Sequence, residues 1–150
     1  MRSQKCERRY DMTAKEYLSQ YITAGEEIKA LCYELERVKS ISEKVTVSFE
    51  SDGGASGSVN VNKIPEAVEK IIEIERDIGE RVSNLAFLRI DIYNTICRVP
   101  DGKLRVILLK RYIGNESFER ISMDMCYTYN HVIKVMHPKA LDEVEKLLSD

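Results

Sequence analysis

Two runs of apolar residues constrain the fold of this chain more than any other feature, because each repeats at alternating steps of four and three residues. That spacing places the apolar side chains on one face of a long helix, as in a coiled coil. Each run is long enough for a helix of roughly 50 Å at about 1.5 Å per residue. Their similar lengths predict an all-α fold with a long antiparallel helical hairpin over residues 12–98. The first run consists of Tyr17, Tyr21, Ala24, Ile28, Leu31, Leu35, Val38 and Val45, and the second of Ile64, Ala67, Ile71, Ile74, Ile78, Leu85, Leu88 and Ile92.

Polar residues interrupt both runs, at Ser42 in the first and at Arg81 and Thr95 in the second. A polar residue in such a seam can select a register or an oligomer, so Ser42 and Arg81 are candidates for specifying a partner. The interpretation that we favour is that both lie at solvated positions. Apolar surface left over by the hairpin is expected to drive formation of a homodimer or another small homo-oligomer.

The segment between the two runs, residues 46–63, is rich in Gly and Ser and is too long for a tight connection between helices. We therefore expect a mobile loop there. Val45, Val47 and Phe49 on one flank, and Val59 and Val61 on the other, alternate with other residues, so a two-stranded ribbon is an alternative. An isolated ribbon is marginally stable, which favours the loop. Residues 1–11 are expected to form a flexible extension.

Residues 118–135 have the spacing of a helix-turn-helix, in which two short helices cross at a steep angle. Ser117 and Thr128 stand where these helices would begin, and their hydroxyls can accept hydrogen bonds from backbone N–H groups there. Ser122 supplies a small side chain where the two backbones approach. The turn usually carries Gly because its backbone has a positive φ, whereas this chain has Cys126. The apolar residues expected at the contact between the helices are Ile121, Met125, Tyr127, Val132 and Val135.

Two further helices are predicted around this motif, within a DNA-binding domain at residues 99–150. Residues 99–102, Val-Pro-Asp-Gly, break the second long helix, and residues 103–112 form a helix that packs under the motif. Pro138 has no backbone N–H and disfavours helical geometry at His137. The second helix of the motif is therefore predicted to kink or stop there, and residues 139–148 to form a separate closing helix.

Basic residues gather around the motif although the whole chain is slightly acidic. Lys and Arg number 23 against 25 Asp and Glu, and this net charge of -2 gives no support for nucleic-acid binding. Residues 102–115 and 125–141, however, contain no acid, which predicts a locally positive face. An ordinary solvated face is the alternative. The basic residues and histidines of these two segments are Lys103, Arg105, Lys110, Arg111, His131, Lys134, His137 and Lys139.

The second helix of a helix-turn-helix enters the major groove of double-stranded DNA with its N-terminal part. Asn130 can pair with adenine, Ile133 can contact a thymine methyl group, and Lys134 can reach guanine or phosphate. Partly buried packing is an equally supported role for Tyr129, and a structural anchor is the favoured role for Arg111. The residues predicted to face the groove are Thr128, Tyr129, Asn130, Ile133, Lys134 and His137, and those predicted to contact phosphate are Ser117, Lys103, Lys110 and Arg111.

Other classes of function find little support in the sequence. Two histidines, no Gly-rich phosphate loop and no spaced Ser-His-Asp set indicate neither an enzyme nor a bound cofactor. The four cysteines show no CxxC spacing, so we expect reduced, mostly buried thiols and no metal site. No apolar run approaches the roughly 18 residues of a membrane span, and the start lacks an apolar signal core. We expect a cytoplasmic protein that does not bind membranes.

The order of these parts resembles two known groups of proteins. The predicted DNA-binding domain at residues 99–150, here called the head, is similar to the fourth conserved region of bacterial sigma factors. The similarity lies in the triplets KRY at residues 110–112 and KAL at residues 139–141, which flank the helix-turn-helix. Residues 12–18, MTAKEYL, followed by the hairpin and this head, resemble phage regulators of the RinA and ArpU type. Cys126 and an extra residue before the second triplet depart from the pattern, and residues 1–11 precede the usual family start. The resemblance implies an activator of late phage genes, with the host RNA polymerase as an implied partner.

Two other functions share these features. Phage small terminases also join a helix-turn-helix to helical oligomerisation segments, but they form large rings and usually carry the head first. A helical protein-protein adaptor would use the hairpin alone. The order of hairpin and then head favours the transcription regulator.

Overall fold

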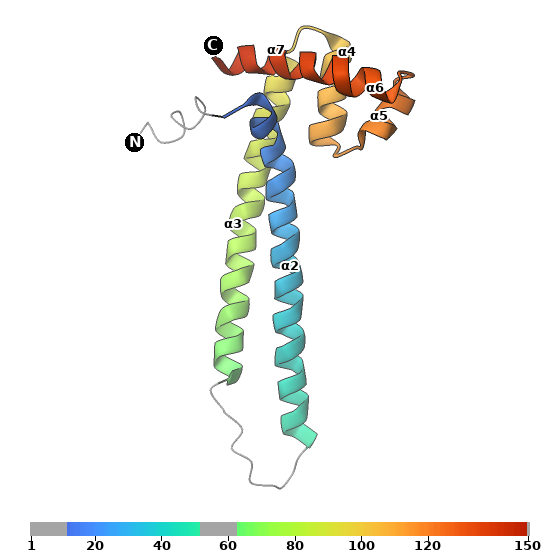
Figure 1. The fold of residues 1–150 in the computed structure, drawn as a ribbon. Coiled ribbons are helices and arrows are strands. Elements are labelled where there is room, and N and C mark those ends of the chain that lie inside the picture. The colour runs from blue at the N-terminus through green and yellow to red at the C-terminus, as the bar shows by residue number, and fades with distance from the viewer. Residues whose placement is uncertain (1–11, 52–62, 150) are drawn as a thin grey trace, which may run out of the picture. The chain divides into compact units, whose positions relative to one another are not determined.

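The computed structural model describes residues 12–51 and 63–149, with the backbone alone for residues 45–51 and 63–64. All regular structure in these residues is helical, which confirms the predicted fold class. Figure 1 shows the two long helices, α2 (Ala14–Ser51) and α3 (Lys63–Cys97), side by side. The elements that follow them are α4 (Gly102–Leu108), the π-helical turn η1 (Leu109–Ile113), α5 (Phe118–Asp124), α6 (Tyr129–His131), the π-helical turn η2 (Val132–Met136) and α7 (His137–Ser149).

The two long helices run antiparallel, as predicted. Glu27 of α2 pairs with Arg81 of α3 at 2.9 Å. Lys39, further along α2, pairs with Glu75, which comes earlier in α3, at 2.7 Å. Residue numbers therefore rise along α2 where they fall along α3.

The predicted seam lies between these helices. Every apolar seam residue within residues 12–44 and 65–97 is half-buried or buried, which confirms the alternating spacing. Ile74 is the most buried of them within residues 25–84, at 6% exposure. The other apolar seam residues within residues 25–44 and 65–84 are half-buried, because two helices alone cannot enclose a seam on all sides. Arg81 is exposed and bridges Glu27 and Asp77, so its interpretation as a solvated residue is confirmed. Ser42 is half-buried.

By its internal contacts the described chain divides into two compact units. The hairpin unit consists of residues 25–84. The head unit consists of residues 12–24, which begin α2, and residues 85–149, which include the end of α3 and all later helices. Both ends of the hairpin predicted at residues 12–98 thus lie in the same compact unit as the helices of residues 99–149.

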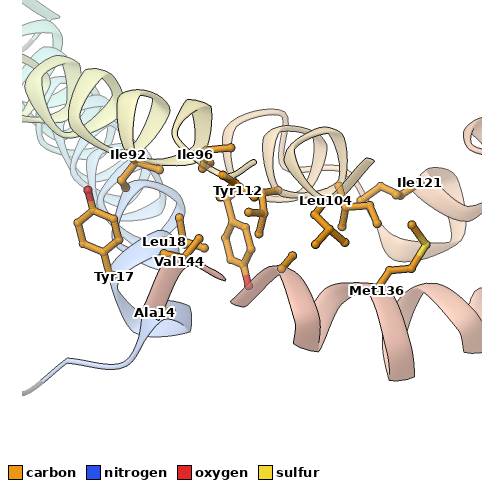
Figure 2. Close-up of a cluster of buried hydrophobic side chains, with 14 of the residues drawn as sticks. Ala14, Tyr17, Leu18, Ile92, Ile96, Leu104, Tyr112, Ile121, Met136 and Val144 are labelled. Atoms are coloured by element: carbon orange, nitrogen blue, oxygen red, sulfur yellow. The ribbon is translucent and has the colours of Figure 1, made fainter. Parts of the chain in front are cut away.

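One buried apolar cluster holds the head unit together (Figure 2). It joins Tyr17 and Leu18 of α2 to Ile92 and Ile96 of α3, and both pairs to the later helices. Burial of one such side chain contributes about 1.5–3 kcal/mol, so the cluster is the main source of stability in this unit. Its remaining buried members are Ala14, Val99, Leu104, Ile107, Leu108, Tyr112, Ile121, Val132, Met136, Ala140 and Val144.

The start of α2 is capped twice. Thr13 N donates to Glu16 Oε2 (2.9 Å) and Glu16 N donates to Thr13 Oγ1 (3.3 Å), which together form a capping box. The hydrogen bonds that the backbone N–H and then the hydroxyl of Thr13 donate to Glu16 Oε2 lower the pKa of Glu16. In addition, Ala14 N donates to Glu145 Oε2 of α7 at 2.6 Å. Two carboxylates thus lie at the positive end of the α2 dipole, where negative charge is stabilising.

The segment between the long helices is shorter than predicted. Because α2 continues through Ser51 and α3 begins at Lys63, the loop predicted at residues 46–63 is wrong for residues 46–51 and 63. The alternative ribbon is wrong for its first strand, since residues 45–49 lie in α2. Val45 continues the seam spacing of α2, and this helical period outweighs the local alternation. Val59, Val61 and the rest of the loop, like residues 1–11, lie outside the described residues.

The helix does not end at Pro138. The helical backbone continues from Tyr129 to Ser149 without interruption. Of the kink or stop predicted at His137, the stop is therefore wrong, and so is the separate helix at residues 139–148. In η2 the hydrogen bonds span five residues, and His137 N donates to Val132 O. A π-helical turn accommodates one extra residue and changes the bonding just before the proline, which has no N–H of its own to donate.

The seam can be tested with Leu31→Asp and Ile78→Asp. Each change places a charge at a half-buried apolar position between α2 and α3, and should reduce the free energy of unfolding by about 2 kcal/mol. Urea unfolding followed by circular dichroism measures this. Tyr33→Asp is the matched control, because Tyr33 lies on α2 at 73% exposure and should change stability little. Equal effects at Leu31 and Tyr33 would contradict the seam.

Candidate nucleic-acid interface

The first helix of the predicted motif, α5, begins as the sequence indicates. Ser117 is its N-cap, and its hydroxyl accepts a hydrogen bond from Arg120 N at 3.3 Å. Ile121 is fully buried and Ser122 is 5% exposed. Ser122 Oγ donates to Glu119 O at 2.8 Å, so its hydroxyl is satisfied within α5 while the small side chain lets the next segment approach.

The turn after α5 has the backbone geometry that the motif requires. Cys126 has φ 56°, in the left-handed region where glycine is the usual residue. Its N–H donates to Met123 O (3.2 Å), and Tyr127 N donates to Ser122 O (2.9 Å). The sequence analysis noted the missing glycine as a departure, and the structure shows that cysteine adopts the same conformation at some cost in strain.

The second helix begins at its predicted cap and packs on the first. Thr128 Oγ1 accepts a hydrogen bond from His131 N at 3.3 Å. Ile121 of α5 and Val132 of η2 are both fully buried in the same cluster. The described residues therefore contain a helix-turn-helix with both caps and its central apolar contact in place.

Exposure then separates the predicted contact residues into three groups. Ile133, Lys110 and Arg111 are half-buried, and His137 is buried. The exposed residues are Lys103, Ser117, Thr128, Tyr129, Asn130 and Lys134.

The exposed group includes the first residues of the second helix, as groove recognition requires. Tyr129 is 44% exposed, so it is available for contact with a ligand as well as for packing. Lys134 follows Asn130 by one helical turn, and it forms no ion pair with any described residue. An amide, a phenol and an ammonium group thus share an accessible helical surface, which is suited to hydrogen bonding with base edges and phosphates.

Lys103 reaches this surface from α4. Its Nζ lies 5.8 Å from the centre of the Tyr127 ring, and the hydrogen bond to Tyr127 raises the pKa of Lys103. The Tyr127 ring in turn lies 5.5 Å from that of His131. The predicted phosphate contact Lys103 is therefore held next to the start of the second helix.

Lys110 and Arg111, predicted to contact phosphate, both make contacts within the chain. Lys110 pairs with Asp124 at 2.9 Å and with Glu116 at 3.2 Å, and these carboxylates raise the pKa of Lys110. Arg111 donates to Glu116 O at 2.9 Å, and its guanidinium lies 4.9 Å from the centre of the Phe118 ring. Together they tie η1 to the start of α5, which agrees with the structural role favoured for Arg111.

The prediction that His137 faces the groove is wrong. His137 is 9% exposed, its Nε2 lies 2.9 Å from the Tyr112 hydroxyl, and its ring meets that of Phe118 edge to face at 4.8 Å. The extra residue in η2 turns the following residues inward relative to a regular α-helix. For the same reason Val135, predicted to be packed, is 38% exposed, and Met136 takes its place in the core.

Burial also sets the protonation of His137. Loss of solvent, and then the nearby charges of Lys15 and Arg111, lower its pKa to about 4. Burial likewise raises the pKa of Tyr112. At neutral pH the pair is uncharged, and the Tyr112 hydroxyl can donate to the unprotonated Nε2.

Sequence reasoning assigned no contact with DNA to some exposed residues of these helices. His131 and Lys139 are exposed on the continuous helix that carries the predicted contacts, and only their place in an acid-free segment indicated them. Glu119, Ser122, Met123 and Tyr129 line a shallow depression beside the helix start. Hydrogen bonds from its own backbone N–H, from Ser117 and from Tyr129 lower the pKa of Glu119, so this depression carries a negative charge.

The sequence also led to expectations about cysteines, metal sites and membrane spans. Cys32, Cys97 and Cys126 are free thiols as predicted, but they are exposed and not buried. No cluster of three or more potential metal ligands occurs within residues 12–51 and 63–149. Within the same ranges, no helix combines the length and the apolar character that crossing a bilayer demands.

Comparison of the chain with protein-family models, with curated proteins and with solved structures gave no match in any of the three. The resemblance to sigma factors and to RinA and ArpU regulators therefore stays a prediction, carried by the residues quoted for it.

Cys126→Gly should stabilise the protein. Glycine removes the steric cost of the positive φ, which is partly offset by the greater freedom of glycine in the unfolded chain, for a net gain of about 0.5–1 kcal/mol. Urea midpoints of the variant and the parent measure it. Asn115→Gly is a suitable control, because Asn115 also has a positive φ, of 52°, but asparagine tolerates that region better. A loss of stability in Cys126→Gly would disprove strain at the turn.

The head unit should lose stability in mild acid because of His137. Its pKa is about 4 in the folded chain and ordinarily 6.5, so the unfolded state binds the proton first. The stabilisation is complete above pH 6.5 and falls by up to about 3 kcal/mol as the pH decreases toward 4. Thermal unfolding of the parent and of His137→Gln across this range isolates the effect, since other groups titrate in both. Parallel pH profiles would show that His137 is not responsible.

Proposed function

We propose that the chain is a sequence-specific double-stranded DNA-binding transcription regulator of a phage or prophage. The observation that carries this proposal is the helix-turn-helix of α5 and α6 with polar, exposed residues at the start of its second helix. In this class of motif those positions read base edges in the major groove.

The roles of individual residues follow from exposure and chemistry. Asn130 is suited to a bidentate contact with adenine, and Lys134 to guanine or phosphate. Ser117, Thr128 and Lys103 are exposed and are suited to the phosphate backbone, which positions the protein without selecting a sequence. Ile133, half-buried, offers an apolar edge to a thymine methyl group.

The more specific role, activation of late genes, rests on the resemblance of residues 12–18 and of the head to RinA and ArpU regulators. A head similar to the fourth region of sigma factors would present promoter DNA beside the host RNA polymerase. No feature of the described residues favours the alternative small-terminase or adaptor function over this one.

Asn130→Ala and Lys134→Ala should each weaken specific DNA binding by about 1–3 kcal/mol. The measurement is fluorescence anisotropy at fixed salt with a duplex that the full chain selects from a random pool. Both variants should also lower expression from a reporter that carries the selected site upstream of a late phage promoter.

Asn94→Ala and Lys44→Ala are the matched controls, because both residues are exposed on the long helices and should leave affinity unchanged. Unchanged affinity in the two head variants would remove the proposed recognition surface. Intact DNA binding with normal late transcripts and a loss of packaged DNA on gene deletion would support the terminase function in its place.

A further inference from the structure

The two sides of the hairpin unit differ in chemistry. On α3 the seam residues of this unit lie at positions 67, 71, 74, 78 and 81. The residues that follow them form one side of the helix, and those that precede them form the other. The first set is Val68, Ile72, Glu75, Gly79 and Val82, and the second is Glu66, Lys70, Glu73, Asp77 and Glu80. One side is mainly apolar, and every residue of the other is charged.

The side of α3 that carries Val68, Ile72 and Val82 adjoins a side of α2 that is charged but balanced. The 2.7 Å ion pair between Lys39 and Glu75 shows which edges of the two helices meet there. We call this surface the neutral face, because its two lysines are balanced by two glutamates. It consists of Gly25, Lys29, Cys32, Glu36 and Lys39 of α2 and Val68, Ile72, Glu75, Gly79 and Val82 of α3.

Large apolar side chains on the neutral face are left in solvent. Ile72 is 60% exposed, Val82 48% and Val68 46%. Apart from Ile74, the apolar seam residues beside them are only half-buried, since the described hairpin unit covers the seam with two helices. Both observations indicate a surface that gains from a second pair of helices.

None of the described residues explains two glycines on this face. A Cβ atom added at Gly25 or at Gly79 would meet nothing within 4 Å, so neither glycine relieves an internal clash. Glycine in the middle of a helix is less stable than alanine. Small residues there do allow another helix to approach closely, which accounts for both.

We propose that the neutral face binds the neutral face of a second copy of this chain, so that two hairpin units form a four-helix bundle with twofold symmetry. A twofold interface places the same patch on both partners and must be complementary to itself. The neutral face meets this requirement, because its charges balance and the Lys39–Glu75 pair, whose side chains stay 45% and 49% exposed, can share its charges with the same pair of the second copy. The opposite side, with its excess of acids, would repel its own copy.

The size of the surface is sufficient. Twenty-residue helical segments, 25–44 and 65–84, are about 30 Å long, and two packed helices are about 20 Å wide. Their product is about 600 Å² for each copy and about 1,200 Å² for the pair, at the lower end of specific interfaces. This inference does not depend on DNA binding.

Light scattering of the full chain tests it. We expect twice the chain mass of 17.3 kDa for the parent, and the mass of a single chain for Ile72→Glu and for Gly79→Leu at the same concentration. Ile72→Glu buries an unpaired charge in the interface, and Gly79→Leu blocks the approach of the helices. Both residues are exposed in the single chain, so helicity by circular dichroism should be retained.

Tyr33→Glu is the matched control, because Tyr33 is exposed on α2 outside the neutral face and the variant should keep the parent's mass. A parent that remains a single chain, a larger ring, or a dimer that both face variants leave intact would each overturn the proposal. A single-chain parent would leave the neutral face to a different protein.

Discussion

The head unit depends on the contact between the start of α2 and the end of the chain's last helix. Ala14 N donates to Glu145 Oε2 at 2.6 Å, and Leu18 and Val144 belong to the same buried cluster (Figure 2). Without this contact the N-terminal N–H groups of α2 would lose one acceptor, and the buried cluster would lose the packing of α7 against α2. The helix-turn-helix is therefore built on a core to which both ends of the hairpin contribute.

Periodicity and capping chemistry predicted most of this fold because both act over a few residues. The seam of α2 and α3, the caps Ser117 and Thr128, and the buried pair Ile121 and Val132 all follow from local spacing. The same local rules failed where a longer-range effect outweighed them. For example, α2 continues through residues 45–49, although their apolar residues alternate as in a strand.

The start of the second helix and its exposed residues agree with the sequence prediction, whereas the position of His137 does not. A regular α-helix would place His137 in solvent, whereas the π-helical turn at residues 132–136 moves it under Tyr112 and Phe118. The extra residue noted before the KAL triplet at residues 139–141 was the one sign of it in the sequence, and it did not show that the helix would contain a π-helical turn. Likewise, the acid-free segment around Lys110 and Arg111 gave no sign that Glu116 and Asp124 would fold back onto them.

The bond from Ala14 to Glu145 joins residues that are 131 positions apart, and this separation sets an order of events during synthesis. The α2 and α3 segments of the hairpin unit leave the ribosome early, and their pairing closes a comparatively short stretch of chain. The core of the head unit cannot be completed before α7 is present, because contacts between residues far apart in the sequence form only after the intervening chain has been brought together. Until α7 has been synthesised, the apolar residues at the start of α2 therefore lack their final partners.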